Sequence, residues 1–61
     1  MIPIYIICFN NGYYVNNTIQ QLVSKNISMD QITVLDNNSN GKETLEILER
    51  LKCKLIRFSE N

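Results

Sequence analysis

Hydrophobic residues gather along the chain in three short runs, at residues 2–8, 31–35 and 54–58. Each run has the length and the β-branched or aromatic content of a strand. The first run barely alternates between apolar and polar positions, and its Pro3 stands where a strand tolerates proline, at the beginning. A strand without alternation is typical of a parallel sheet that is covered on both faces. The pattern therefore predicts three strands in a parallel sheet.

The stretches between these runs have helical periodicity. Residues 13–25 carry one apolar stripe, and Asn26 suits the end of such a helix. A second helix is expected from about residue 42 to residue 52, where Asn40 and Glu43 form a weak capping-box pattern at its start. The predicted buried positions are Val15, Ile19, Leu22 and Val23 in the first helix and Leu45, Ile47, Leu48 and Leu51 in the second.

The order of elements is thus βαβαβ, which predicts an α/β fold. Crossovers between parallel strands are right-handed in ~98% of cases, so two successive crossovers that progress in the same direction place both helices on one face of a three-stranded parallel sheet. The expected strand order is 3-2-1. The other face of this sheet would be bare although its residues are apolar, so we expect either a missing C-terminal half or a homo-oligomer to cover it.

Composition removes several classes of function. Six Lys and Arg residues balance six Asp and Glu residues, so charge gives no reason to expect binding to nucleic acid or to an anionic membrane. The chain has no histidine, which excludes a Ser-His-Asp or Cys-His catalytic system within it. Its apolar runs are far shorter than the ~20 residues of a membrane span and do not match a signal peptide, so we expect a cytoplasmic protein with no membrane span.

The two cysteines are expected to be free thiols. Cys8 ends the first predicted strand and Cys53 precedes the third, so the 3-2-1 order places them at opposite edges of the sheet. A disulfide requires Cα atoms within ~7 Å, which this placement does not allow.

Polar residues follow the first two predicted strands. The second strand runs into Asp36, Asn37, Asn38 and Ser39, and in open α/β sheets ligands bind beyond such carboxyl ends. The same residues are also ordinary turn formers between a strand and a helix, and that alternative stays open. The loop after the first strand has Gly12 as its one glycine, so the dinucleotide-binding fingerprint of three glycines is absent.

Two segments at their mutual spacing resemble family 2 glycosyltransferases. Residues 4–11, Ile-Tyr-Ile-Ile-Cys-Phe-Asn-Asn, resemble the opening strand of that family, and Tyr14-Val15 follows where its members begin a helix. Residues 34–39, Val-Leu-Asp-Asn-Asn-Ser, resemble the second-strand motif, apolar-apolar-Asp-Asp/Asn-x-Ser. The chain departs from the family pattern at Cys8, where a threonine or serine is usual, and at Asn37, where a second aspartate is frequent.

The resemblance implies a Rossmann-like half of a GT-A domain, with residues 1–61 as a single partial domain, the N-terminal nucleotide-sugar-binding segment. The implied donor is a UDP- or dTDP-linked sugar. A divalent cation (Mn or Mg) and the catalytic base would belong only to a full-length parent, so this chain alone would be inactive. The implied nucleotide-binding residues are Phe9, against the nucleobase, and the polar group Asn10, Asp36, Asn37 and Ser39.

Within that group, Asp36 and Asn37 would bind the nucleobase and the ribose. Asp36 is expected to lie beyond the core. The alternative function, from a different class, is a small α/β binding or interaction module that oligomerises.

Overall fold

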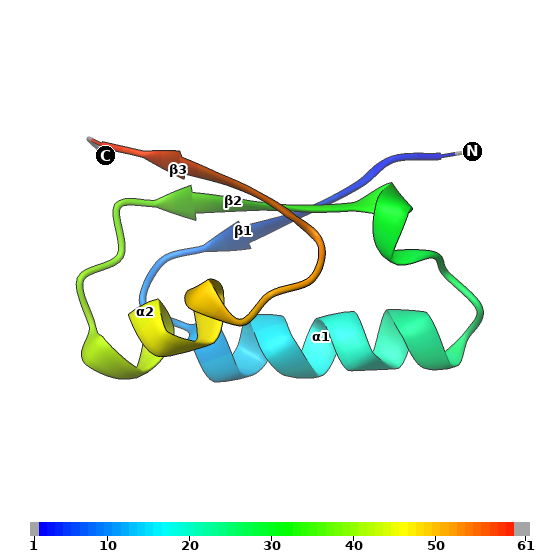
Figure 1. Cartoon of the computed structure of the whole chain (residues 1–61), viewed down its shortest axis with the longest axis horizontal. Helices are drawn as coiled ribbons and strands as arrows, with labels where there is room; N and C mark the ends of the chain where they lie inside the picture. Colours follow the sequence, from blue (N-terminus) through cyan, green and yellow to red (C-terminus); the bar gives the residue numbers. More distant parts are fainter. Residues whose placement is uncertain (1, 60–61) are drawn as a thin grey trace.

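The computed structural model describes residues 2–59. These residues form a three-stranded sheet with two helices packed against it (Figure 1). In chain order the elements are β1 (Ile4–Cys8), α1 (Gly12–Ser24), the short 3₁₀ helix η1 (Met29–Gln31), β2 (Ile32–Asn37), α2 (Lys42–Glu49) and β3 (Lys54–Phe58).

The sheet confirms the predicted topology. Its order is β1-β2-β3 and both pairings are parallel, with Ile6 opposite Val34 and Val34 opposite Leu55. Both helices lie on the same side of the sheet (Figure 1). The α/β class, the strand order and the one-sided helices therefore agree with the prediction from the right-handed crossover rule.

Helix α1 ends in a hydrogen-bonded motif centred on Asn26. The Asn26 N–H donates to the Val23 carbonyl and the Ile27 N–H donates to the Leu22 carbonyl, which is the Schellman pattern. Asn26 has a φ of 70°, in the left-handed region that this motif requires. The predicted helix end is thus confirmed. The predicted apolar stripe is one residue too wide, because Val23 is exposed.

Helix α2 begins at Lys42, as expected, but it is shorter than expected and is capped differently. It ends at Glu49 rather than near residue 52, because the chain must turn back to β3 within residues 50–53. Its N-cap is Gly41, without a side-chain hydrogen bond. The predicted capping box is therefore wrong, since the side chain of Asn40 instead accepts a hydrogen bond from Asn10.

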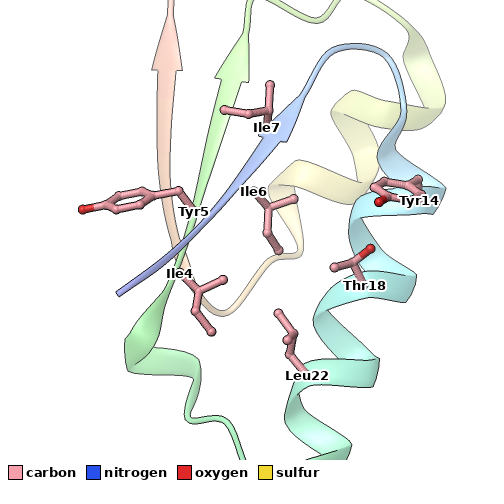
Figure 2. Close-up of a pocket in the computed structure, with 7 residues that line it drawn as sticks. All are labelled: Ile4, Tyr5, Ile6, Ile7, Tyr14, Thr18 and Leu22. Atoms are coloured by element: carbon pink, nitrogen blue, oxygen red, sulfur yellow. The ribbon is translucent and has the colours of Figure 1, made fainter. Parts of the chain in front are cut away.

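A groove runs along the free edge of β1, between this strand and α1 (Figure 2). It has a volume of about 390 Å³. Ile4 and Ile6 point from β1 toward α1, whereas Tyr5 points away from the helix (Figure 2). Tyr14, Thr18 and Leu22 form the helical wall.

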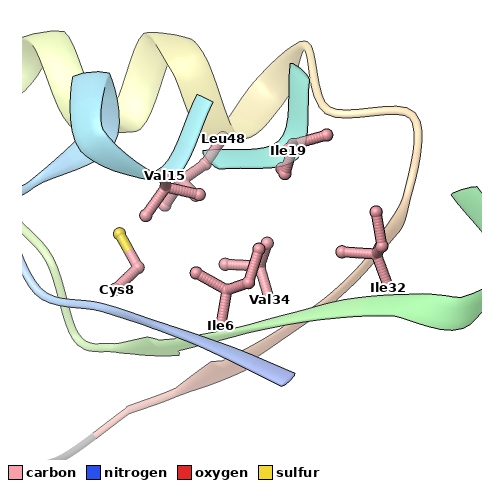
Figure 3. Packing of buried hydrophobic residues seen from close by; sticks show 7 residues of the cluster. All are labelled: Ile6, Cys8, Val15, Ile19, Ile32, Val34 and Leu48. Carbon is pink, nitrogen blue, oxygen red and sulfur yellow. The ribbon is translucent and has the colours of Figure 1, made fainter. Parts of the chain in front are cut away.

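The hydrophobic core lies between the sheet and the helices (Figure 3). Alternate residues of β1 and β2 point into it and meet one side of each helix. The buried members are Ile6, Cys8, Val15, Ile19, Ile32, Val34 and Leu48.

The opposite face of the sheet is uncovered by any element of residues 2–59. We call it the bare face and define it by Tyr5, Ile7, Leu35, Ile56 and Phe58, which the register places on one side. Tyr5 and Ile7 are 60% and 62% exposed, and Ile56 and Phe58 are also exposed. The predicted exposed apolar face is therefore present. Within the described chain, β1 lacks the two-sided cover that its apolar pattern indicated.

Candidate functional site at the carboxyl edge of the sheet

Two loops meet beyond the carboxyl ends of β1 and β2, and the side chain of Asn10 joins them. Its Oδ1 accepts hydrogen bonds from the backbone N–H groups of Asn40 (2.9 Å) and Gly41 (2.8 Å). Its Nδ2 donates to Oδ1 of Asn40 (3.1 Å). Asn10 has a φ of 54°, a left-handed conformation that asparagine tolerates better than most residues. The first loop is thus held against the N-terminus of α2.

Ser39 lies under this junction and is buried. Its Oγ accepts a hydrogen bond from the backbone N–H of Asn10 (2.8 Å) and donates to Oδ1 of Asp36. The thiol of Cys8 lies 3.8 Å from the same Oγ, and burial raises the pKa of this thiol. A single hydroxyl therefore connects the ends of β1 and β2.

Asp36 is fully buried, with 0% of its surface exposed. Its Oδ2 accepts hydrogen bonds from the Ser39 N–H (3.2 Å) and from Nε of Arg57 (2.8 Å). Nη2 of Arg57 also donates to the Ser39 carbonyl (3.1 Å). The expectation that Asp36 lies beyond the core is therefore wrong, because β2 extends to Asn37 and turns the carboxylate toward the helix side of the sheet.

Electrostatics agree with an ionised Asp36. Burial acts to raise the pKa of this carboxyl group, but the hydrogen bonds from Ser39 and Arg57 outweigh burial and hold the pKa below its usual value. The Arg57 side chain is 45% exposed, so the carboxylate of this ion pair is buried while the arginine side chain is open to water. The charged Asp36 side chain thus fixes the positions of Ser39 and Arg57.

The structure divides the predicted site residues into two groups. Asn10, Asp36 and Ser39 share one hydrogen-bond network. Asn37 follows Asp36 in the same strand, so its side chain points to the opposite face, in register with Phe58. Phe9 is half-exposed in the loop after β1, and its backbone N–H donates to Oδ1 of Asn11.

Two contributors were missed by the sequence analysis. Arg57 pairs with Asp36 because the parallel register places them side by side. Side chains alternate between the two faces of a strand, so the position of Arg57 two residues after apolar Leu55 could have indicated that it lies on the helix side of the sheet. Thr44 is buried in α2, and its Oγ1 accepts a hydrogen bond from the Gly12 N–H (3.0 Å). No apolar periodicity reveals such a threonine.

Three further observations bear on the chemistry of the site. Residues 2–59 contain no group of three or more His, Cys, Asp or Glu side chains that could hold a metal ion. Cys8 and Cys53 are free thiols, as predicted. In the described part of the chain, neither helix has the length and apolar character needed to cross a membrane.

Comparisons of the chain with protein-family models, with curated proteins and with solved structures found no match.

Proposed function

We propose that this chain forms the nucleobase- and ribose-binding part of the donor site of a nucleotide-sugar-dependent glycosyltransferase. The donor would be a UDP- or dTDP-linked sugar. The main support is the fixed junction of the two loops at the carboxyl edge, made by Asn10 and Ser39. Ligands of open α/β sheets bind at this edge, and loops that are already ordered lose less entropy on binding.

Phe9 provides the apolar surface of the proposed site. Its side chain is 50% exposed although it directly follows a buried strand residue, Cys8. A half-exposed aromatic ring offers a flat face on which a pyrimidine base can stack. We therefore assign Phe9 the contact with the nucleobase.

The polar roles differ from those that the sequence alone suggested. The Asp36 carboxylate is closed to solvent, so we assign it a positioning role: it holds Ser39 and Arg57. Arg57 uses its Nε–H and one Nη2–H in these bonds, while its side chain stays partly exposed. The outer guanidinium N–H groups can donate to carbonyl oxygens of the base or to ribose hydroxyls.

In this proposal the chain alone would bind the nucleotide but would not catalyse glycosyl transfer. Transfer from a nucleotide sugar usually relies on a cation to neutralise the departing diphosphate, and residues 2–59 offer no cluster for one. In this proposal the cation and the catalytic base belong to a longer parent protein. The nucleobase and the ribose of the ligand then supply the affinity for the nucleotide, for which we expect a dissociation constant of about 1 mM, on the order of 4 kcal/mol.

Saturation-transfer NMR with UDP and dTDP, applied to matched variants, tests these assignments. Phe9→Ala should abolish transfer to the base protons, because the stacking face is removed. Tyr5→Ala is the control, since Tyr5 is also an exposed aromatic but lies near the start of β1, on the bare face and away from the carboxyl edge. Equal loss of signal in both variants, or no signal with the native chain, would contradict the proposed site.

A second candidate function rests on a different observation, the bare face. Four large apolar side chains are exposed there: Tyr5, Ile7, Ile56 and Phe58. Contiguous apolar patches of more than a few hundred Å² mark interaction surfaces. On this evidence the chain would serve as a small α/β interaction module. If the native chain binds nucleotide and the Phe9→Ala variant does not, this result favours the glycosyltransferase proposal over the interaction module.

A further inference from the structure

The two edges of the sheet differ in how they are protected. In the described chain β1 and β3 each pair with β2 alone, so each leaves a row of backbone N–H and C=O groups unpaired. Edge strands usually carry charges that discourage pairing with another strand. β3 carries Lys54 and Arg57, whereas β1 carries no charge. The β1 edge is thus the unprotected one.

The lack of charge extends well beyond β1. Residues 2–24, which include all of β1 and α1, contain no Asp, Glu, Lys or Arg. The six basic and six acidic side chains of the protein all lie from Lys25 onward. The groove between β1 and α1 is therefore lined without a charged side chain, by aliphatic residues and by Tyr5, Tyr14 and Thr18.

We propose that the β1 edge binds the β1 edge of a second copy of this chain, which forms a continuous six-stranded sheet. A twofold axis makes the two edge strands antiparallel, and each copy then presents the same surface to the other. Two uncharged surfaces meet without like-charge repulsion and without burial of an unpaired charge. A strongly charged partner would find no opposite charge on this edge.

The groove gives the added strand a place for its side chains. Antiparallel pairing centred on Ile6 sets Ile4 opposite Cys8 of the partner and Tyr5 opposite the partner's Ile7. Residues on the helix side of the added strand then lie along the groove wall formed by α1, while Tyr5 and Ile7 extend the bare face. The surface used is the strand edge and not the bare face itself.

Two neighbouring tyrosines in α1 provide a matched test. Tyr13 and Tyr14 are 68% and 65% exposed, but only Tyr14 lines the groove. Tyr14→Lys places a positive charge beside the same charge of the second copy, whereas Tyr13→Lys adds that charge outside the groove. Thr18→Lys, one turn further along the groove, serves as an independent second variant, and circular dichroism checks that each variant is folded.

Sedimentation velocity from about 10 μM to about 1 mM measures the association. We expect the native chain and Tyr13→Lys to form a dimer with equal affinity. Tyr14→Lys and Thr18→Lys should each weaken the dimer by about tenfold or more. Amide hydrogen exchange should show concentration-dependent protection of β1.

Three results would overturn the proposal: a native monomer at about 1 mM, equal affinity of all variants, or a dimer that only Ile56→Lys on the bare face disrupts.

Discussion

The carboxylate of Asp36 connects segments that are distant in the sequence. It accepts hydrogen bonds from Ser39 in the loop after β2 and from Arg57 at the end of β3. Ser39 in turn accepts a hydrogen bond from the backbone of Asn10, in the loop after β1. A change at this single residue should therefore disturb all three strand ends at once.

Substitution of Asp36 by asparagine should lower stability in a pH-dependent way. The pKa of Asp36 is depressed in the folded state, so its contribution to stability is present above the unfolded pKa of ~3.9 and is lost as the pH falls through the folded value. At pH 7 we expect Asp36→Asn to cost roughly 1–3 kcal/mol, because buried Ser39 loses its ionised partner. At acidic pH the native chain and the variant should converge.

Urea unfolding at several pH values measures this effect. The exposed Asp30 provides the control, and Asp30→Asn should leave the free energy of unfolding almost unchanged at pH 7. A constant difference between the native chain and Asp36→Asn down to acidic pH would contradict the assigned role of the carboxylate.

At the scale of the element, the end of α1 shows what local sequence can specify. The Asn26 stop needs only the left-handed tolerance of asparagine and the two backbone hydrogen bonds of the Schellman motif. Ile27 and Leu22, which the motif brings together, both pack against the core. The signal is confined to a few consecutive residues, and sequence analysis recognised it.

Replacement of Asn26 by glycine should stabilise the protein by up to ~1 kcal/mol, because glycine adopts a positive φ without a steric cost. The same replacement at exposed Asn17, inside α1, should destabilise it by roughly a few tenths of a kcal/mol. Thermal or urea unfolding compares the two variants. Equal effects at both positions would show that the left-handed conformation of Asn26 does not limit stability.

The contact between the two helices depends on Gly12. A Cβ atom at this position would lie 2.9 Å from the Cα of Thr44, and this backbone atom cannot move without displacing α2. Gly12→Ala should therefore cost roughly 1–3 kcal/mol despite the better helix propensity of alanine. Asn17→Ala, where the helix is exposed, should instead be neutral or slightly stabilising, as urea unfolding can establish. A stabilised Gly12→Ala protein would contradict the close packing of α1 on α2.

Other features of the elements depend on tertiary contacts that the sequence pattern does not contain. β3 was predicted with the bounds observed, since its five residues fit a strand wherever they pack. α2 also begins at Lys42, as predicted, but its cap was not predicted, because Asn40 bonds to Asn10 in another loop and leaves Gly41 as the N-cap. The burial of Asp36 likewise depends on Arg57, which reaches it only through the register of the sheet.

For the molecule as a whole, the strand order and the one-sided helices were predicted from the rule for right-handed crossovers and from the assumption that both crossovers progress in the same direction. The parallel pairing of β1 with β2 brings the carboxyl ends of these strands together, which is why Asn10, Asp36 and Ser39 share an edge. It does not say which side chains stay open to a ligand. In the structure Phe9 and Arg57 are partly exposed there, while Asp36 is closed.

A titration of the chain with UDP and with dTDP, followed by amide chemical shifts, tests the proposed nucleotide site most directly. We predict saturable shifts with a dissociation constant of about 1 mM, confined to residues 9–12 and 36–40 and to Arg57. An unchanged spectrum at about 10 mM nucleotide, in a folded sample, would contradict the proposal. Shifts that follow the bare face instead of the carboxyl edge would contradict it equally.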